Sequence, residues 1–210
     1  AGIIKQGVPV VTSASQSEVL KVIKKVAELK GAKLYQVGKD VAFVVEQFPT
    51  NPDSNYQFNI KGMLKKYRKL RTSLLGYHQI INATTAICAI EVLQKHHGFK
   101  ITAQDIKTGL IQARIRGRLE LIKKSPFVLL DGAHNPASAA VLRKALEDYF
   151  SSIRLILVIG ILQDKDVGGM VKELLQGNKN LSRVIIAQPK ISRAAEPKKI
   201  CDEVTKYTDK

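Results

Sequence analysis

The sequence LLDGAHNPASAA (Leu129–Ala140) joins an apolar segment to an amphipathic one through a short polar loop. The apolar residues Phe127–Leu130 end at Asp131, and Asn135–Pro136 combines a good helix N-cap with the residue best suited to the first helical position. The pattern predicts a strand, a tight loop and a helix. Asp131 and His134 would then lie at the carboxyl end of a strand, where open α/β sheets bind ligands and a helix N-terminus favours anions. A turn aspartate and a surface histidine are the alternative interpretation.

The chain after Gly117 alternates between strand-like and helix-like segments. Such alternation is typical of an α/β fold in which helices connect parallel strands. We therefore expect a Rossmann-like parallel sheet in this region. The expected strands are Leu119–Ile122, Phe127–Leu130, Leu155–Ile159 and Val184–Ala187, and the expected helices are Pro136–Phe150, Val167–Leu175 and Pro197–Tyr207.

The chain before Gly117 also mixes strands and helices. Ser15 and Glu18 have the spacing of a capping box, and Gly31 would end the helix that they start. Strands are expected in Val8–Ser13, Ala32–Val37 and Asp40–Phe48. A helix is expected from His78 to about His97, with a buried stripe of Ala83, Ala86, Ile87, Ile90 and Leu93. Thr102 and Asp105 form a second capping box, which should start a helix that runs to about Ala113.

The segment Lys61–Arg71 is strongly basic, with Lys or Arg at six of its eleven positions and no acidic residue. Leu64, Tyr67 and Leu70 have helical spacing, and strands are the alternative. A solvated basic face is favoured over a nucleic-acid-binding patch, because Tyr67 alone could stack on bases. We expect no nucleic acid partner.

Composition sets further limits on the function. The chain has 210 residues with 34 basic and 18 acidic side chains, and the net charge of +16 favours anionic partners. No apolar run approaches the ~20 residues of a membrane-spanning helix and no signal peptide is apparent, so we expect a cytoplasmic protein without a membrane partner. Cys88 and Cys201 fall on apolar helix faces and are expected to be reduced core residues. Neither His78 with Gln79 nor the adjacent His96–His97 has metal-ligand spacing, so we expect no metal site.

Four segments, in order, resemble motifs of the folylpolyglutamate synthase/dihydrofolate synthase family in the Mur ligase superfamily. One segment resembles the end of the family's central lysine motif, one its Leu-Leu-Gly-x-His-Gln-x-x-Asn-Ala motif, one its interdomain Pro-Gly-Arg motif and one its C-terminal-domain signature. They are AGIIKQGVPVVTS (Ala1–Ser13), LLGYHQIINATTA (Leu74–Ala86), GRLELI (Gly117–Ile122) and LDGAHNP (Leu130–Pro136).

The resemblance implies a domain organisation. Residues 1–116 would be the C-terminal part of a central P-loop-type ATPase domain, and residues 117–210 a Rossmann-like glutamate ligase domain truncated at its end. The sequence contains no GxxxxGK[ST] loop, which the family carries upstream together with its Mg²⁺ ligands and its modified lysine. We therefore expect an internal fragment of a longer protein that lacks turnover as an isolated chain.

The resemblance also implies the residues that bind ATP. Asn82 matches an asparagine that contacts the nucleotide, Arg118 an arginine that reaches the ATP phosphates, and Asp131 an aspartate on the ribose. An arginine fork suits phosphate, and a carboxylate suits ribose hydroxyls. Arg116 stands where the family has proline, so two arginines compete for the hinge role, and we favour Arg118 because Gly117 precedes it.

Residues for the incoming amino acid come partly from the same resemblance and partly from a loop that follows an expected strand. His134 matches a histidine near the phosphates or the glutamate, and we expect it, with Lys165, to be catalytic. Lys165, in the loop Gly160–Asp166, would bind the carboxylate of the amino acid or a phosphate, while Asp166 would also cap the next helix. Ser192 and Arg193 match a segment near the glutamate site.

The implied function is an ATP-dependent ligase that adds L-glutamate to folate, to dihydropteroate or to both, through an acyl phosphate. ATP with Mg²⁺ is the implied cofactor, and a monomer is the expected state. Another Mur-type amino-acid ligase is the nearest alternative, and a basic nucleic-acid-binding module is the alternative from another class.

Overall fold

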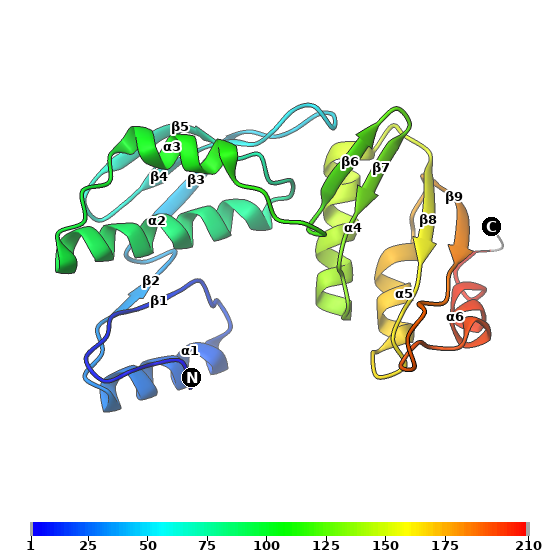
Figure 1. Ribbon diagram of the computed structural model, residues 1–210, viewed down its shortest axis with the longest axis horizontal. Coiled ribbons are helices and arrows are strands. Elements are labelled where there is room, and N and C mark those ends of the chain that lie inside the picture. The colour runs from blue at the N-terminus through cyan, green and yellow to red at the C-terminus, as the bar shows by residue number, and fades with distance from the viewer. Residues whose placement is uncertain (1, 209–210) are drawn as a thin grey trace. The chain divides into compact units, whose positions relative to one another are not determined.

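The computed structural model describes residues 2–208, and the chain divides into two compact units (Figure 1). Unit 1 comprises Ala1–Phe48 and Asn55–Arg114, and unit 2 comprises Pro49–Ser54 and Ile115–Lys210. Within unit 2, an ion pair between Asp53 and Lys124 connects the short segment Pro49–Ser54 to the rest of that unit. No helix in the described part of the chain is long and apolar enough to cross a bilayer.

Unit 1 begins with a βαβ segment. Strands β1 (Val10–Thr12) and β2 (Leu34–Gln36) pair in parallel, and α1 (Ser17–Leu29) connects them. The capping box expected from Ser15 and Glu18 is wrong. Gln16 is the N-cap and makes no side-chain cap, and the Ser17 hydroxyl donates to the Glu18 carboxylate instead, because the helix starts one residue later than the pattern required.

The basic segment Lys61–Arg71 is a hairpin, which settles the choice between helix and strand. An antiparallel sheet of order β3-β4-β5 contains it. A bulge opposite β4 inserts Lys69 at φ +53°, so the buried Tyr67 and Leu70 lie three residues apart in a strand. That three-residue spacing is what imitated a helix. The strands are β3 (Ala42–Gln47), β4 (Gln57–Lys61) and β5 (Lys66–Arg71).

Two helices pack with these sheets, α2 (His78–His97) and α3 (Ala103–Gln112). Both helices were expected, and α3 has the predicted capping box of Thr102 and Asp105. The buried stripe predicted for α2 is partly wrong. Ala86 and Leu93 are exposed, because apolar residues occur on several sides of α2 and their spacing does not fix which side faces the sheet. The buried positions of α2 are Gln79, Ile80, Ala83, Thr84, Ile87, Cys88, Glu91 and Val92.

Unit 2 is an α/β structure, as expected, but its sheets are not all parallel. Two residues, Ser125 and Pro126, connect β6 to β7, and such a short connection permits only an antiparallel pair. Strands β8 and β9 are parallel, and α5 connects them (Figure 1). The elements are β6 (Glu120–Lys124), β7 (Phe127–Leu130), α4 (Pro136–Phe150), β8 (Leu155–Ile159), α5 (Val167–Leu175), β9 (Leu181–Ile186) and α6 (Pro197–Val204).

Helix α5 lies at the centre of the unit 2 core, with Val171 fully buried. Residues from α4, β8 and α6 pack around it, including Ala139, Ile159 and Ile200. The core therefore fixes the N-termini of α4 and α5 and the carboxyl end of β8, which are the positions where the predicted site residues lie.

The two cysteines differ, contrary to the expectation that both lie in the core. Cys88 is fully buried, and burial, with the nearby Glu91 charge, raises its pKa to about 11. Cys201 is exposed, because Ile200 and Val204 form the buried side of α6.

We therefore expect a thiol-alkylating reagent at pH 8 to modify Cys201 in the native protein and to reach Cys88 only after unfolding, because the thiolate is the reactive species. Peptide mass spectrometry with and without denaturant measures this difference. Equal modification of both cysteines in the native protein would contradict the burial of Cys88.

Candidate functional site

The loop after β7 is held against the start of β6 by its own aspartate. Asp131 accepts two backbone hydrogen bonds, one from Leu119 to Oδ2 and one from Ala133 to Oδ1, both of 2.8 Å. The amide of Gly132 also donates to the carbonyl of Gly117 at 2.8 Å. Asp131 thus shapes the loop, and each carboxylate oxygen retains a second lone pair for a ligand.

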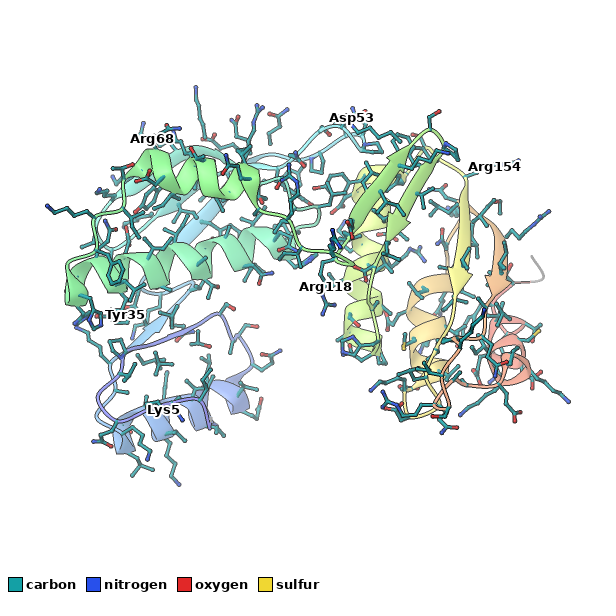
Figure 2. All side chains as sticks on the ribbon, in the orientation of Figure 1. Lys5, Tyr35, Asp53, Arg68, Arg118 and Arg154 are labelled. Atoms are coloured by element: carbon teal, nitrogen blue, oxygen red, sulfur yellow. The ribbon has the colours of Figure 1, made fainter. Side chains whose placement is uncertain are left out.

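Arg118 lies beside this loop, two residues before β6 begins (Figure 2). A Cβ built on Gly132 would be 3.7 Å from its Nη1. The flanking residues are both left-handed, Gly117 at φ +66° and the buried Leu119 at φ +47°. Left-handed backbone is costly for leucine and is often found at functional sites. Arg118 is thus placed beside the loop, and it is exposed, as Arg116 is. The choice of Arg118 over Arg116 as the phosphate-binding arginine stays a prediction.

His134 lies immediately before the N-terminus of α4, where Asn135 and Ser138 form a capping box. Its Nδ1 lies 2.9 Å from the carbonyl oxygen of Gly132, a group that can only accept. In the neutral ring this contact places the proton on Nδ1 and leaves Nε2 as an acceptor. The exposed His134 ring and the helix N-terminus are thus presented by one fixed loop.

The loops after β8 and β9 are joined to each other by backbone hydrogen bonds. Gln163 donates to the carbonyl of Arg193 at 2.8 Å, and Ala195 donates to the carbonyl of Ile161 at 2.9 Å. Gly160 permits this close approach, because a Cβ at that position would be 2.6 Å from the Ala187 carbonyl oxygen. The two loops therefore form one platform at the carboxyl ends of the parallel strands.

An ion cluster lies on this platform. The Asp164 carboxylate is 2.9 Å from the Lys165 ammonium and 3.9 Å from the Arg193 guanidinium. The hydrogen bond from Lys165 is the main reason why the pKa of Asp164 is lowered, and Arg193 adds a smaller electrostatic effect. Ser192 is exposed in the turn that carries Arg193. Asp164 was not among the predicted site residues, because neighbouring residues of opposite charge seldom signal a cluster.

The helix that follows this loop begins as predicted. Asp166 is the N-cap of α5 and accepts a hydrogen bond of 2.9 Å from the amide of Gly169. A Cβ on Gly169 would be 2.7 Å from Pro136, so the N-termini of α4 and α5 lie in direct contact. The structure thus brings the loops after β7 and β8 together within unit 2.

Asn82 belongs to unit 1 and is exposed on α2. Its amide donates to Gln79 Oε1 at 3.0 Å, and the Gln79 amide nitrogen lies 3.0 Å from His78 Nε2. The buried Gln79 therefore orients the Asn82 side chain. Within residues 2–208, no three His, Cys, Asp or Glu side chains are grouped so that they could hold a metal ion.

Residues 117–210 match the family described as "Mur ligase, glutamate ligase domain". These residues are a Mur ligase glutamate ligase domain. The chain is 38% identical to the dihydrofolate synthase/folylpolyglutamate synthase of Bacillus subtilis over 175 residues, which is 83% of this chain and 40% of that protein. Since residues 117–210 cannot supply 175 positions, the similarity extends into unit 1. The family resemblance drawn from the four motifs is confirmed.

Solved structures agree with this assignment. The folylpolyglutamate synthase of Thermotoga maritima is similar with a TM-score of 0.82 and 32% identity, over 99% of this chain and 47% of that one. An FPGS–AMPPCP–folate complex is similar with a TM-score of 0.78 and 28% identity, over 90% of this chain and 44% of that one. The chain thus spans less than half the length of these relatives.

Proposed function

We propose that the intact protein is an ATP-dependent ligase that joins L-glutamate to folate, to dihydropteroate or to both. The observation that carries the proposal is the fixed Asp131–Asn135 loop at the carboxyl end of β7, with Arg118 beside it and a helix N-terminus behind it. This arrangement suits an anionic nucleotide, because it combines a guanidinium with the positive end of a helix dipole. The relatives named above are synthases of this reaction class.

The proposed ATP contacts follow from the geometry of each residue. Arg118 would bind phosphate oxygens, and Asp131 would accept from the ribose hydroxyls through the lone pairs that its backbone contacts leave unused. Asn82 is the third proposed nucleotide contact, and the hydrogen bond from its amide to Gln79 orients its side chain. Mg²⁺ would accompany ATP, but the described residues form no metal site, so we assign it no ligand here.

The proposed chemistry is transfer of the γ-phosphoryl group to a carboxylate, followed by attack of the glutamate amine and loss of phosphate. Lys165, Ser192 and Arg193 would bind the incoming amino acid, since cationic and hydroxyl groups match its carboxylates. His134, with Nε2 as an acceptor, could take a proton from the attacking amine. From the composition we place the reaction in the cytoplasm, and from the family resemblance we expect a monomer.

Nucleic acid binding by the basic hairpin β4–β5 is disfavoured. Figure 2 shows Arg68 pointing away from the body of unit 1, as expected for a solvated basic face. Phe58 and Tyr67, the aromatic residues of this hairpin, are 0% and 2% exposed and cannot stack on a base.

The first test is ADP release by the full-length protein with Mg-ATP and L-glutamate, with tetrahydrofolate and dihydropteroate supplied in turn. Release that needs glutamate and one of these pterins supports the proposal and identifies the acceptor. A folded, ATP-binding protein without pterin-dependent release would instead be a ligase for another Mur-type substrate.

Arg118→Ala should lower kcat/KM for ATP about ten- to hundredfold, because charge-assisted hydrogen bonds contribute about 1.5–3 kcal/mol. Arg116→Ala is the matched control, since it removes an equally exposed arginine two residues away and should leave the kinetics near those of the wild type. Similar losses in both variants would argue for a general effect of charge and against a specific phosphate contact by Arg118.

A further inference from the structure

The ion cluster on the β8–β9 platform has an alternating charge pattern. Lys165 and Arg193 flank Asp164, whose two carboxylate oxygens face one cation each, Oδ2 toward Lys165 and Oδ1 toward Arg193. The order of charges is therefore positive, negative, positive. A site built for phosphate alone would gain nothing from the central carboxylate, which repels an anion.

A dicarboxylic amino acid carries the complementary pattern. L-Glutamate has two carboxylates and one ammonium group, so two cations and one anion are the partners that satisfy all three. Recognition by opposite charges gives specificity as well as affinity, because an anion without the ammonium group leaves Asp164 opposed by like charge.

We propose that Asp164 binds the amino group of the incoming dicarboxylic amino acid while Lys165 and Arg193 bind its carboxylates. The inference rests on the proposed ligase function and assigns the amino-acid side of the same site. It also decides between the two roles left open for Lys165, in favour of the amino acid over phosphate.

The cluster is accessible and its backbone is fixed. The side chains of Asp164, Lys165 and Arg193 are 44%, 31% and 63% exposed, so a ligand can reach all three. The buried Ile161 and Ala195 anchor the loops beneath them through a backbone hydrogen bond of 2.9 Å. A preorganised scaffold lowers the cost of ordering the site on binding.

The protonation state of Asp164 suits binding and not proton removal. Its pKa is lowered, mainly by the hydrogen bond from Lys165, so the carboxylate remains charged at neutral pH. A carboxylate with a low pKa is a weak base, whereas its charge attracts an ammonium group. Removal of the amine proton would therefore fall to another group.

The test measures equilibrium binding of L-glutamate and of glutarate to the full-length protein saturated with a non-hydrolysable ATP analogue. Glutarate keeps both carboxylates and lacks the amino group. In Asp164→Asn we expect Kd for L-glutamate to rise about ten- to hundredfold, as for loss of a charge-assisted contact. Kd for glutarate should stay unchanged or fall, because the like charge is gone.

Further variants accompany Asp164→Asn. Asp202→Asn removes an exposed carboxylate on α6 and should change neither Kd. Asp164→Glu keeps the charge and should retain much of the preference for L-glutamate. Asp164→Ser, which also removes the charge, is the test variant if the asparagine variant does not fold. An equal rise in Kd for both ligands in Asp164→Asn would overturn the proposal, because Asp164 would then only position Lys165 and Arg193.

Unchanged binding of both ligands in Asp164→Asn would also overturn the proposal, as would failure of L-glutamate to bind the wild type. These outcomes differ from failure of the proposed function. If the wild-type protein binds L-glutamate with the expected dependence on Asp164 but releases no ADP with either pterin, the proposed amino-acid site stands and the folate substrate is wrong.

Discussion

Glu91→Ala should lower the free energy of unfolding of unit 1 by about 3 kcal/mol or more, because a buried donor left without an acceptor costs about 1–3 kcal/mol and Glu91 satisfies three. The Glu91 carboxylate is fully buried on α2 and accepts from the amide of Met63 at 2.6 Å, the amide of Lys65 at 3.1 Å and the hydroxyl of Tyr67 at 3.0 Å. It therefore holds the β4–β5 turn on the helix. Urea denaturation followed by circular dichroism measures the effect.

Two comparisons separate this effect from a general loss of charge. Tyr67→Phe removes one of the three donors and leaves the other two bound, so it should cost about 1 kcal/mol. Glu28→Ala removes an exposed carboxylate from α1 and should change stability by less than about 0.5 kcal/mol. A Glu91→Ala protein that unfolds at the wild-type midpoint would show that the turn is held by other contacts.

The Glu91 anchor also explains why sequence patterns failed in this part of the fold. A glutamate within an apolar helix indicates a solvent-facing position, and its partners lie 24 to 28 residues earlier in the chain. Gly62 also lies close to this carboxylate, since a Cβ there would be 2.3 Å from it, but a glycine in the sequence does not indicate which residue it approaches. No periodicity argument connects such positions, so the buried face of α2 was predicted only in part.

Structural features that depend on residues adjacent in the sequence could be predicted. The first residues of α4 and α5 follow from the N-caps Asn135 and Asp166, whose side chains accept from the helix amides as expected. The sheet was harder to predict, because hydrophobic strands indicate a sheet covered on both faces. Here Ile156 and Val158 on β8 are 61% and 63% exposed, so apolar strand composition overstated their burial.

In the candidate site too, local features could be predicted and long-range ones could not. Asp131 and His134 could be found because a strand, a loop and a helix N-cap follow one another in the sequence. The pairing of Asp164 with Arg193 could not, because it depends on how the loops after β8 and β9 meet in space. Charged residues brought together by sheet topology leave no spacing signature in the chain.

Gly160→Ala should both destabilise unit 2 and weaken binding of the amino acid. The added methyl group would lie 2.6 Å from the Ala187 carbonyl oxygen and 3.1 Å from Pro189, and backbone cannot move aside as a flexible side chain can. Overpacking of this kind costs about 1–3 kcal/mol. The displaced segments carry Lys165 and Arg193, so Kd for L-glutamate should rise together with the loss of stability.

Gly109→Ala is the matched control, because the same substitution should have the opposite sign there. Gly109 lies inside α3, has no atom within 4 Å of an added Cβ and has no positive φ, so alanine should stabilise the helix by about 0.5–1 kcal/mol. Thermal unfolding of the two variants, with L-glutamate titrations, tests both signs at once. If Gly160→Ala were as stable as the wild type and bound L-glutamate normally, the close approach of the two loops would not be what positions the cations. Destabilisation with normal binding would mean that the loops keep their geometry despite the strain.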